Sequence, residues 1–226
     1  MKNIFSPLRI VDIEDSGNNG IIYKALDWGR SRALKVMYGF SVPLGVLDGK
    51  AKIEFERTKL LEGIEGIPKA YKLYSPLDSD GHNFVPFTAA GFDLEKAKSQ
   101  IMRQRDAFEF DSENDLILGG AFTMTYMDVF SKLPREPKDL DYALPKKFFD
   151  KLEYIADEML KKGLSLPPES DFCFDKNLEP IVLDFGNCLS FDNLKISGMS
   201  ESFANTYVKQ KNNSTIYFLK DQYSRK

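Results

Sequence analysis

The sequence has little of the residues on which several kinds of protein chemistry depend. It contains two cysteines, Cys173 and Cys188, and one histidine, His82. Two cysteines supply neither a disulfide framework nor paired Cys-x-x-Cys metal ligands, so both are expected to be core thiols in a reducing compartment. Because His82 lies in the polar stretch at residues 78–83, a solvated side chain is expected, and catalysis by Ser-His-Asp or Cys-His groups is not predicted.

Long apolar runs and an excess of positive charge are also absent from the sequence. No apolar run approaches the roughly 20 residues that a membrane-spanning helix needs, and the first residues do not resemble a secretory signal. We expect no membrane span and a cytoplasmic location. Delivery into a host cell by a specialised secretion system that reads an uncleaved amino terminus stays open. A net charge of −3 at pH 7 predicts no general affinity for nucleic acid.

The composition that is present is that of an ordinary globular protein. The chain has 226 residues, of which 42% are hydrophobic and 29% are charged. This length suits one large domain or two small lobes. We expect a monomer with a first lobe over residues 1–127 and a second over 128–226, the first interrupted by an insertion at about 75–120.

The most informative stretch covers residues 178–187. Three apolar residues of an expected buried strand, from Ile181 to Leu183, lead directly into Asp184, Phe185 and Gly186. A carboxylate at a strand end, followed by a glycine that permits a sharp turn, suits a divalent metal that holds a phosphate. The alternative is an ordinary turn at the end of a strand.

A lysine among apolar residues is the second informative feature. Strands are predicted at residues 8–13, 21–27 and 31–38, and Lys35 lies inside the third. A charge in such a position costs several kcal/mol unless it is paired. A helix predicted over residues 50–63 offers Glu56 as the partner, and Glu54 is the alternative in a different register.

The turn between the first two strands contains Gly17 and Gly20. These glycines would let backbone N–H groups approach phosphate oxygens, as in a glycine-rich hairpin over a nucleotide. A plain hairpin turn is the alternative.

The remaining chain is predicted to alternate between irregular and regular segments. A helix from Asp93 to about Ala107 lacks a clean apolar face and is expected on the surface. A strand at 121–128 is followed by a linker at 129–141, and a core helix is predicted from Leu144 to Lys162. The 39 residues after Asn187 are too few for a second helical subdomain, and their lysines are read as a solvated face.

In their order along the chain, these features resemble the eukaryotic-type protein kinase fold over about residues 8–190. The matching parts are the Gly17–Gly20 turn, Lys35 in its strand, Glu56, the segment Met124–Met127, the helix before Gly163, and Leu183–Gly186. The resemblance implies an α+β, bilobal fold. Its N-lobe would be an antiparallel sheet with one helix, and its C-lobe a reduced set of helices.

The resemblance also implies ATP and Mg²⁺ as cofactors. Lys35 would hold the α- and β-phosphates and pair with Glu56, and Asp184 would bind magnesium. The other implied contacts are those of Gly17 and Gly20 over the phosphates, Met124 as the gatekeeper, and the backbone groups of Thr125 and Met127 at adenine.

The sequence departs from the family pattern in three respects, and the third concerns the catalytic loop. Asp15 stands where the first glycine of the family's loop falls, and the end of the activation segment and the later helices are missing. There is no His-Arg-Asp sequence, since the shortened loop holds residues 167–171 instead. A small carboxy-terminal lobe with such a loop is similar to compact bacterial effector kinases. By that comparison Glu169 would be the catalytic carboxylate and Asp171 a metal ligand.

The implied function is that of an atypical Ser/Thr protein kinase acting on a protein substrate or a host partner protein. A pseudokinase, which keeps the fold as an interaction module with or without bound nucleotide, is the alternative. A small-molecule phosphotransferase is disfavoured, because such enzymes usually retain the catalytic aspartate and a larger helical lobe.

Overall fold

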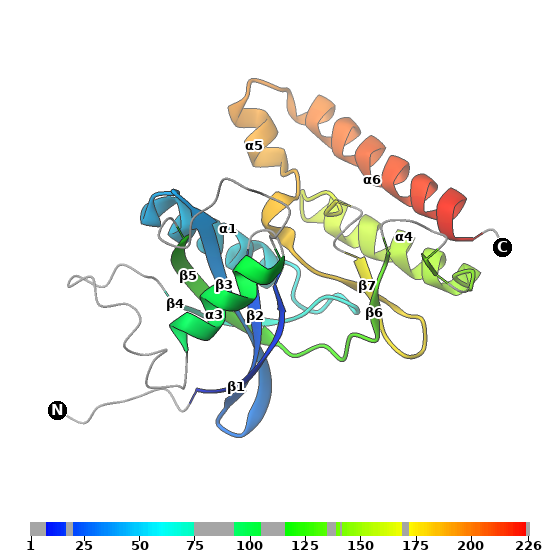
Figure 1. Cartoon of the computed structure of the whole chain (residues 1–226). Coiled ribbons are helices and arrows are strands. Elements are labelled where there is room, and N and C mark those ends of the chain that lie inside the picture. The colour runs from blue at the N-terminus through cyan, green and yellow to red at the C-terminus, as the bar shows by residue number, and fades with distance from the viewer. Residues whose placement is uncertain are drawn as a thin grey trace. The chain divides into compact units, whose positions relative to one another are not determined.

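The structure is a computed structural model in which residues 8–16, 20–74, 93–104, 116–134, 139–140, 142–168 and 172–224 are described. Two compact units make up the chain (Figure 1). The sheet unit comprises Met1–Glu56 and Ala70–Tyr126, and the helical unit comprises Arg57–Lys69 and Met127–Lys226. Residues 57–69 belong to the helical unit, whereas the expected division at 127/128 placed them in the first lobe. The reason is that Leu61, Ile64 and Ile67 pack in the core of the helical unit.

The sheet unit contains a five-stranded antiparallel sheet in the order β1-β2-β3-β5-β4. The strands are β1 Arg9–Ser16, β2 Gly20–Asp27, β3 Arg30–Phe40, β4 Ala70–Tyr74 and β5 Leu116–Thr125. The expected mixed α+β class and the first three strands are confirmed. β5 begins five residues before the predicted strand at 121–128 and ends three residues before its end.

Two helices cover the two faces of this sheet (Figure 1). Leu34 and Val36 of β3 share a core cluster with α3 (Leu94–Gln104), whereas Ala33 and Met37 share one with α1 (Leu44–Leu60). Successive side chains of a strand point to opposite faces. Burial on both faces therefore explains why every residue from Ala33 to Tyr38 is buried.

The predicted surface position of the 93–107 helix is wrong for α3. Ala97 and Ile101 are fully buried and pack in the cluster that covers one sheet face. Two apolar residues four positions apart lie on the same side of a helix. Because Ala97 is small, the helix backbone can approach the sheet closely. A narrow apolar row is therefore sufficient to bury this side of α3 against the sheet.

The helical unit is built around α4 (Lys146–Lys161), whose buried face agrees with the predicted core helix. A small antiparallel sheet of β6 (Ser131–Lys132), β7 (Phe172–Phe174) and β8 (Pro180–Val182) packs with it in one core. A short 3₁₀ turn, η4 (Phe185–Asn187), follows β8. β6 thus lies inside the segment that was expected to be a linker.

The carboxy-terminal residues form α5 (Phe191–Ile196) and the 23-residue α6 (Glu201–Tyr223). α6 runs alongside α4 (Figure 1), and Ile216, Leu219 and Tyr223 join the core of the unit. These residues enlarge the helical packing around α4, which was not predicted. Among the helices described, none has the length and apolar character needed to cross a membrane.

Candidate functional site

Lys35 forms a buried ion pair inside the sheet unit. Its Nζ lies 2.7 Å from Oε1 of Glu54 on α1, and the two side chains are only 5% and 4% exposed. Lys35 points to the sheet face that α1 covers, as do Ala33 and Met37 on the same strand. The predicted pairing of the strand lysine with a helix glutamate is therefore confirmed.

The predicted partner Glu56, however, is wrong. Glu56 is exposed, and the buried row of α1 runs through Leu47, Ala51, Glu54 and Thr58. Two residues along a helix correspond to a rotation of about 200°, so Glu54 and Glu56 cannot face the same side. The predicted apolar row was misread as well, since Ile53 and Leu60 are 46% and 47% exposed.

Gly20 provides the space that the Lys35 side chain occupies. A Cβ atom at Gly20 would lie 3.0 Å from Cε of Lys35 and 3.1 Å from the carbonyl oxygen of Val36. Any larger residue would therefore press on the lysine. Gly17 lies outside the described residues, so the expected phosphate-covering turn is described only from its strand ends.

Asp184 lies two residues after the end of β8 and adopts a left-handed backbone conformation with φ 58° and ψ 70°. Non-glycine residues reach this region at a cost on the order of 1 kcal/mol or more, and such residues are concentrated at functional sites. The sharp turn is made by Asp184 itself. Gly186, at which the turn was expected, is not among the residues with positive φ.

Arg57 holds the backbone directly after Asp184. Its Nη1 donates hydrogen bonds to the carbonyl oxygens of Phe185 (2.9 Å) and Gly186 (2.7 Å). Phe185 is itself buried in the core of the helical unit. Both anchors fix the turn that orients the Asp184 carboxylate, and no pattern in the sequence pointed to Arg57.

The strand that leads to Asp184, β8, is held by the segment around Gly66 at the edge that does not pair with β7. The amide of Val182 donates to the carbonyl of Gly66 at 2.9 Å. A Cβ atom at Gly66, where φ is +89°, would lie 2.6 Å from the carbonyl oxygen of Pro180. Only glycine fits this close approach, so residues 57–69 support β8 as well as joining the core.

The segment that leads to Glu169 is held by the buried side chain of Asn212 on α6. Its Oδ1 accepts from the amide of Leu166 at 2.8 Å, and its Nδ2 donates to the carbonyl of Ala156 at 3.3 Å. Ser165 forms two hydrogen bonds with Leu189. The amide of Ser165 donates to the carbonyl oxygen of Leu189, and the amide of Leu189 donates to Oγ of Ser165. Asn212 was missed, although a polar residue in the apolar i, i+4 row of Ala204, Val208 and Ile216 was a usable signal.

Glu169 and Asp171 lie outside the described residues. Of the two expected metal ligands, only Asp184 can therefore be placed. Within the described ranges, no group of three or more His, Cys, Asp or Glu side chains is positioned to hold a metal. Mg²⁺ at phosphate sites is commonly held by one or two carboxylates together with phosphate oxygens. The half-buried carboxylate of Asp184, presented by a fixed turn, fits one of these positions.

The residues expected at adenine lie at the end of β5. Met124 is buried on the α1 side of the sheet and pairs with Ala33 of β3. The hydroxyl of Thr125 shares a hydrogen bond of 3.2 Å with that of Tyr71. Met127 is half-buried and has no regular secondary structure. Met124 and Thr125 are thus the last residues of β5, and Met127 lies in the segment that follows the strand.

The turn between β7 and β8 carries the clearest electrostatic effects of the helical unit. Burial alone would raise the pKa of Asp175, but hydrogen bonds from the amides of Glu179 (2.9 Å) and Asn177 (2.8 Å) outweigh it and lower the pKa. The pKa of Glu179 is lowered mainly by its hydrogen bond to Lys151, which lies 3.1 Å away. These charges fix the hairpin whose second strand leads to Asp184.

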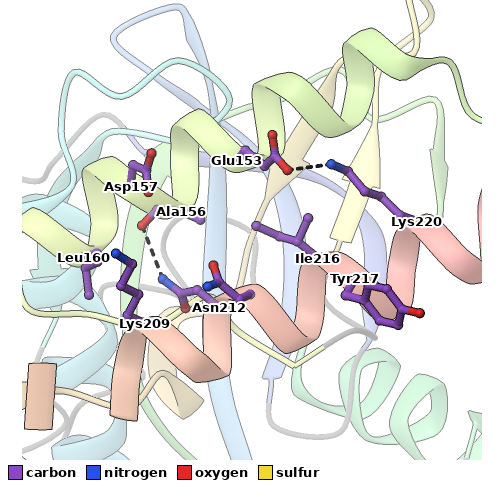
Figure 2. A pocket seen from close by; sticks show the side chains of 10 residues that line it. Glu153, Ala156, Asp157, Leu160, Lys209, Asn212, Ile216, Tyr217 and Lys220 are labelled. Carbon is purple, nitrogen blue, oxygen red and sulfur yellow. Dashed lines mark hydrogen bonds and ion pairs between the residues drawn. The ribbon is translucent and has the colours of Figure 1, made fainter. Parts of the chain in front are cut away.

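A pocket of about 360 Å³ lies between α4 and α6 (Figure 2). Glu153 of α4 and Lys220 of α6 form an ion pair of 2.5 Å at its edge, and Asn212 lines its floor. None of the residues expected to bind nucleotide lines it. Since Glu153, Lys220 and Asn212 already bond across the two helices, we assign the pocket to packing.

In comparisons with known proteins, no protein-family model matches the sequence and no curated protein matches it. A functional assignment therefore rests on the residues described above.

Proposed function

We propose that this protein is an atypical Ser/Thr protein kinase that binds Mg-ATP and transfers the γ-phosphate to a protein hydroxyl. The observation that carries the proposal is the buried pair of Lys35 and Glu54. Burying two charges is a poor means of gaining stability, because desolvation offsets most of their attraction. A strand lysine whose ammonium group is held rigidly by a carboxylate of a neighbouring helix is, in contrast, well suited to binding phosphate oxygens.

The two units would correspond to the two lobes of a kinase-like fold. In the sheet unit, Lys35 would hold the α- and β-phosphates, with Glu54 in the positioning role that the sequence assigned to Glu56. The backbone of Thr125 and Met127 would meet adenine, with Met124 as gatekeeper. In the helical unit, Asp184 would bind the metal. Asp184, with Asp171, would hold Mg²⁺, which would supply neutralisation of the phosphate charge.

Phosphoryl transfer requires mainly positioning of its reactants. The acceptor oxygen attacks the γ-phosphorus, the bond to the β-phosphate oxygen breaks, and ADP leaves with the electron pair of that bond. Glu169 would orient the hydroxyl and accept its proton, and Asp171 would contribute to the metal side. Pro167, which is buried, and the bond between Leu166 and Asn212 fix the chain just before these two residues.

Transfer of radiolabelled phosphate to generic protein acceptors tests the enzyme proposal. Glu169→Gln is expected to leave nucleotide affinity nearly intact while transfer falls by at least about a hundredfold. Asp171→Asn is the matched control in the same loop, and its effect is expected to be milder because asparagine still offers an oxygen to magnesium. Unchanged transfer in Glu169→Gln would reject the catalytic role of this residue.

A pseudokinase is the second candidate, favoured by the absence of a His-Arg-Asp sequence. It would use the fold as an interaction module without chemistry, with or without bound nucleotide. Nucleotide binding without transfer to any acceptor would select it, and the absence of nucleotide binding would reject the kinase.

A further inference from the structure

The turn between β2 and β3 breaks a local rule of hairpin structure. Asp27 pairs with Arg30, which leaves a two-residue turn of Trp28 and Gly29 with φ of 50° and 74°. Two-residue turns with positive φ at both positions favour asparagine, aspartate or glycine first, and a bulky residue there is strained. Trp28 is the only tryptophan of the chain, and it occupies this unfavourable position.

No packing offsets the strain, because the Trp28 side chain is 78% exposed. A large apolar ring held in solvent at a strained turn is a feature that folding alone does not favour. Rule-breaking residues without a structural gain are expected at functional positions. Tryptophan in particular combines an apolar body with an N–H donor, which suits the boundary between an apolar phase and water.

Arginines surround this turn on both faces of the sheet. Arg30 of β3 lies on the face of Leu34, which α3 covers further along the strand. Arg32 shares this face, but its guanidinium is stacked on the ring of Tyr71 at 3.7 Å, so Arg30 is the arginine that is available here. Arg9 pairs with Leu26 of β2 and therefore points to the opposite face, since neighbouring Ala25 belongs to the α3-side cluster. Arg9 and Arg30 are both exposed. Among the described residues at this end of β1, β2 and β3, the three arginines outnumber the acidic Asp27, in a chain of net charge −3.

We propose that the Trp28 turn is a contact site for an anionic lipid bilayer. A flat membrane meets the hairpin tip end-on, where the exposed indole and the exposed Arg9 and Arg30 on the two faces can reach it at once, and the arginine charges complement anionic headgroups. The indole would enter the headgroup region while the guanidinium groups bind lipid phosphates. A few arginines and one ring give weak, reversible binding that salt reduces. This proposal does not depend on kinase activity.

Tryptophan fluorescence, excited selectively over that of the tyrosines, provides a direct test, because Trp28 is the single tryptophan of the chain. Vesicles of phosphatidylcholine with phosphatidylserine are expected to shift the emission to shorter wavelength, and vesicles of phosphatidylcholine alone to leave it unchanged. Arg30→Glu is expected to reduce the shift strongly. Lys209→Glu, the same charge change at an exposed position of α6, should leave the shift unchanged.

Trp28→Asn separates binding from folding. Asparagine suits the turn, so this variant is expected to have a higher urea midpoint than the native chain and to lose co-sedimentation with anionic vesicles. Ile196→Asn, which alters a side chain that is 86% exposed on α5, should co-sediment as the native chain does. An unchanged emission with anionic vesicles, or undiminished sedimentation of Trp28→Asn, overturns the proposal. A shift produced by polyglutamate or RNA but not by vesicles overturns it in favour of a soluble anionic partner.

Discussion

Glu54 and Glu56 lie two residues apart on α1 and have opposite surroundings, which makes them a matched pair. Removing the charge of Glu54 leaves the buried ammonium of Lys35 without its 2.7 Å partner. We expect Glu54→Gln to lower the free energy of unfolding by about 3 kcal/mol, the cost typical of breaking a buried ion pair. Glu56→Gln, at an exposed position, should change it by less than about 0.5 kcal/mol. Urea unfolding measures both, and equal effects would contradict the assigned partner.

The backbone of Asp184 allows strain and metal binding to be separated. Alanine at φ 58° keeps the strain, whereas glycine relieves it. Asp184→Gly is therefore expected to be more stable than Asp184→Ala by about 1 kcal/mol. Both lack the carboxylate and should lose affinity for Mg-ATP to the same extent. A glycine variant that binds Mg-ATP as the native chain does would show that Asp184 is not a metal ligand.

At this scale the sequence indicates which residue types matter better than it indicates their geometry. Lys35 could be singled out because a charge inside an apolar strand needs a partner. Glu54 could not be separated from Glu56, because the apolar row was read from residue 50 onward and omitted Leu47, which fixes the buried side of α1. The turn was assigned to Gly186 because glycine is the usual left-handed residue, whereas Asp184 adopts that conformation.

At the scale of elements, α6 joins the segment at Leu166 to α4 through the side chain of Asn212. Asn212 is buried, and it bridges the segment at Leu166 and Ala156 of α4. Replacing it with alanine leaves the buried amide of Leu166 without its partner, which costs about 1–3 kcal/mol. We expect Asn212→Ala to destabilise the helical unit by this amount. It should also reduce phosphate transfer, because Glu169 follows three residues after Leu166.

Asn213→Ala provides the control for this prediction. Asn213 is adjacent on the same helix but exposed, so its loss should change stability by less than about 0.5 kcal/mol. Thermal unfolding of the two variants measures the difference. Equal melting temperatures would show that Asn212 does not hold the loop.

The elements that the sequence predicted well are those with one strong apolar period. α4 has a continuous apolar face, and β2 and β3 are bounded by clear turn residues. α3 and α6 were misjudged for a physical reason. The buried row of α3 rests on Ala97 and Ile101, and α6 has exposed aromatic residues, including Phe203 and Tyr217, opposite its buried row. Apolar residues on several sides obscure the period on which the prediction depends.

At the scale of the whole molecule, the helical unit is expected to be sensitive to acid. The pKa values of Glu179 and Asp175 are lowered from their ordinary values of 4.5 and 3.8. The stabilisation from these ionised groups is therefore complete above the ordinary values and is lost as the pH falls through the lowered folded-state values. Urea unfolding of the native chain should give a falling midpoint as the pH decreases below 4.5.

Glu179→Gln tests the source of this acid sensitivity. The variant lacks the carboxylate that binds Lys151, so its midpoint should be lower at neutral pH and should depend less on pH in the acid range. An acid dependence equal to that of the native chain would show that Glu179 does not contribute.

The proposed function requires both units to contribute to nucleotide binding, one through Lys35 and the other through Asp184. Calorimetric titration of the native chain with ATP, with and without Mg²⁺, tests this most directly when it is repeated with Asp184→Ala. We predict that the native chain binds ATP more tightly with Mg²⁺, and that Asp184→Ala loses most of this gain but much less of its affinity for metal-free ATP. No binding by the native chain, or an equal effect of Mg²⁺ in the native and Asp184→Ala chains, would contradict the proposed site.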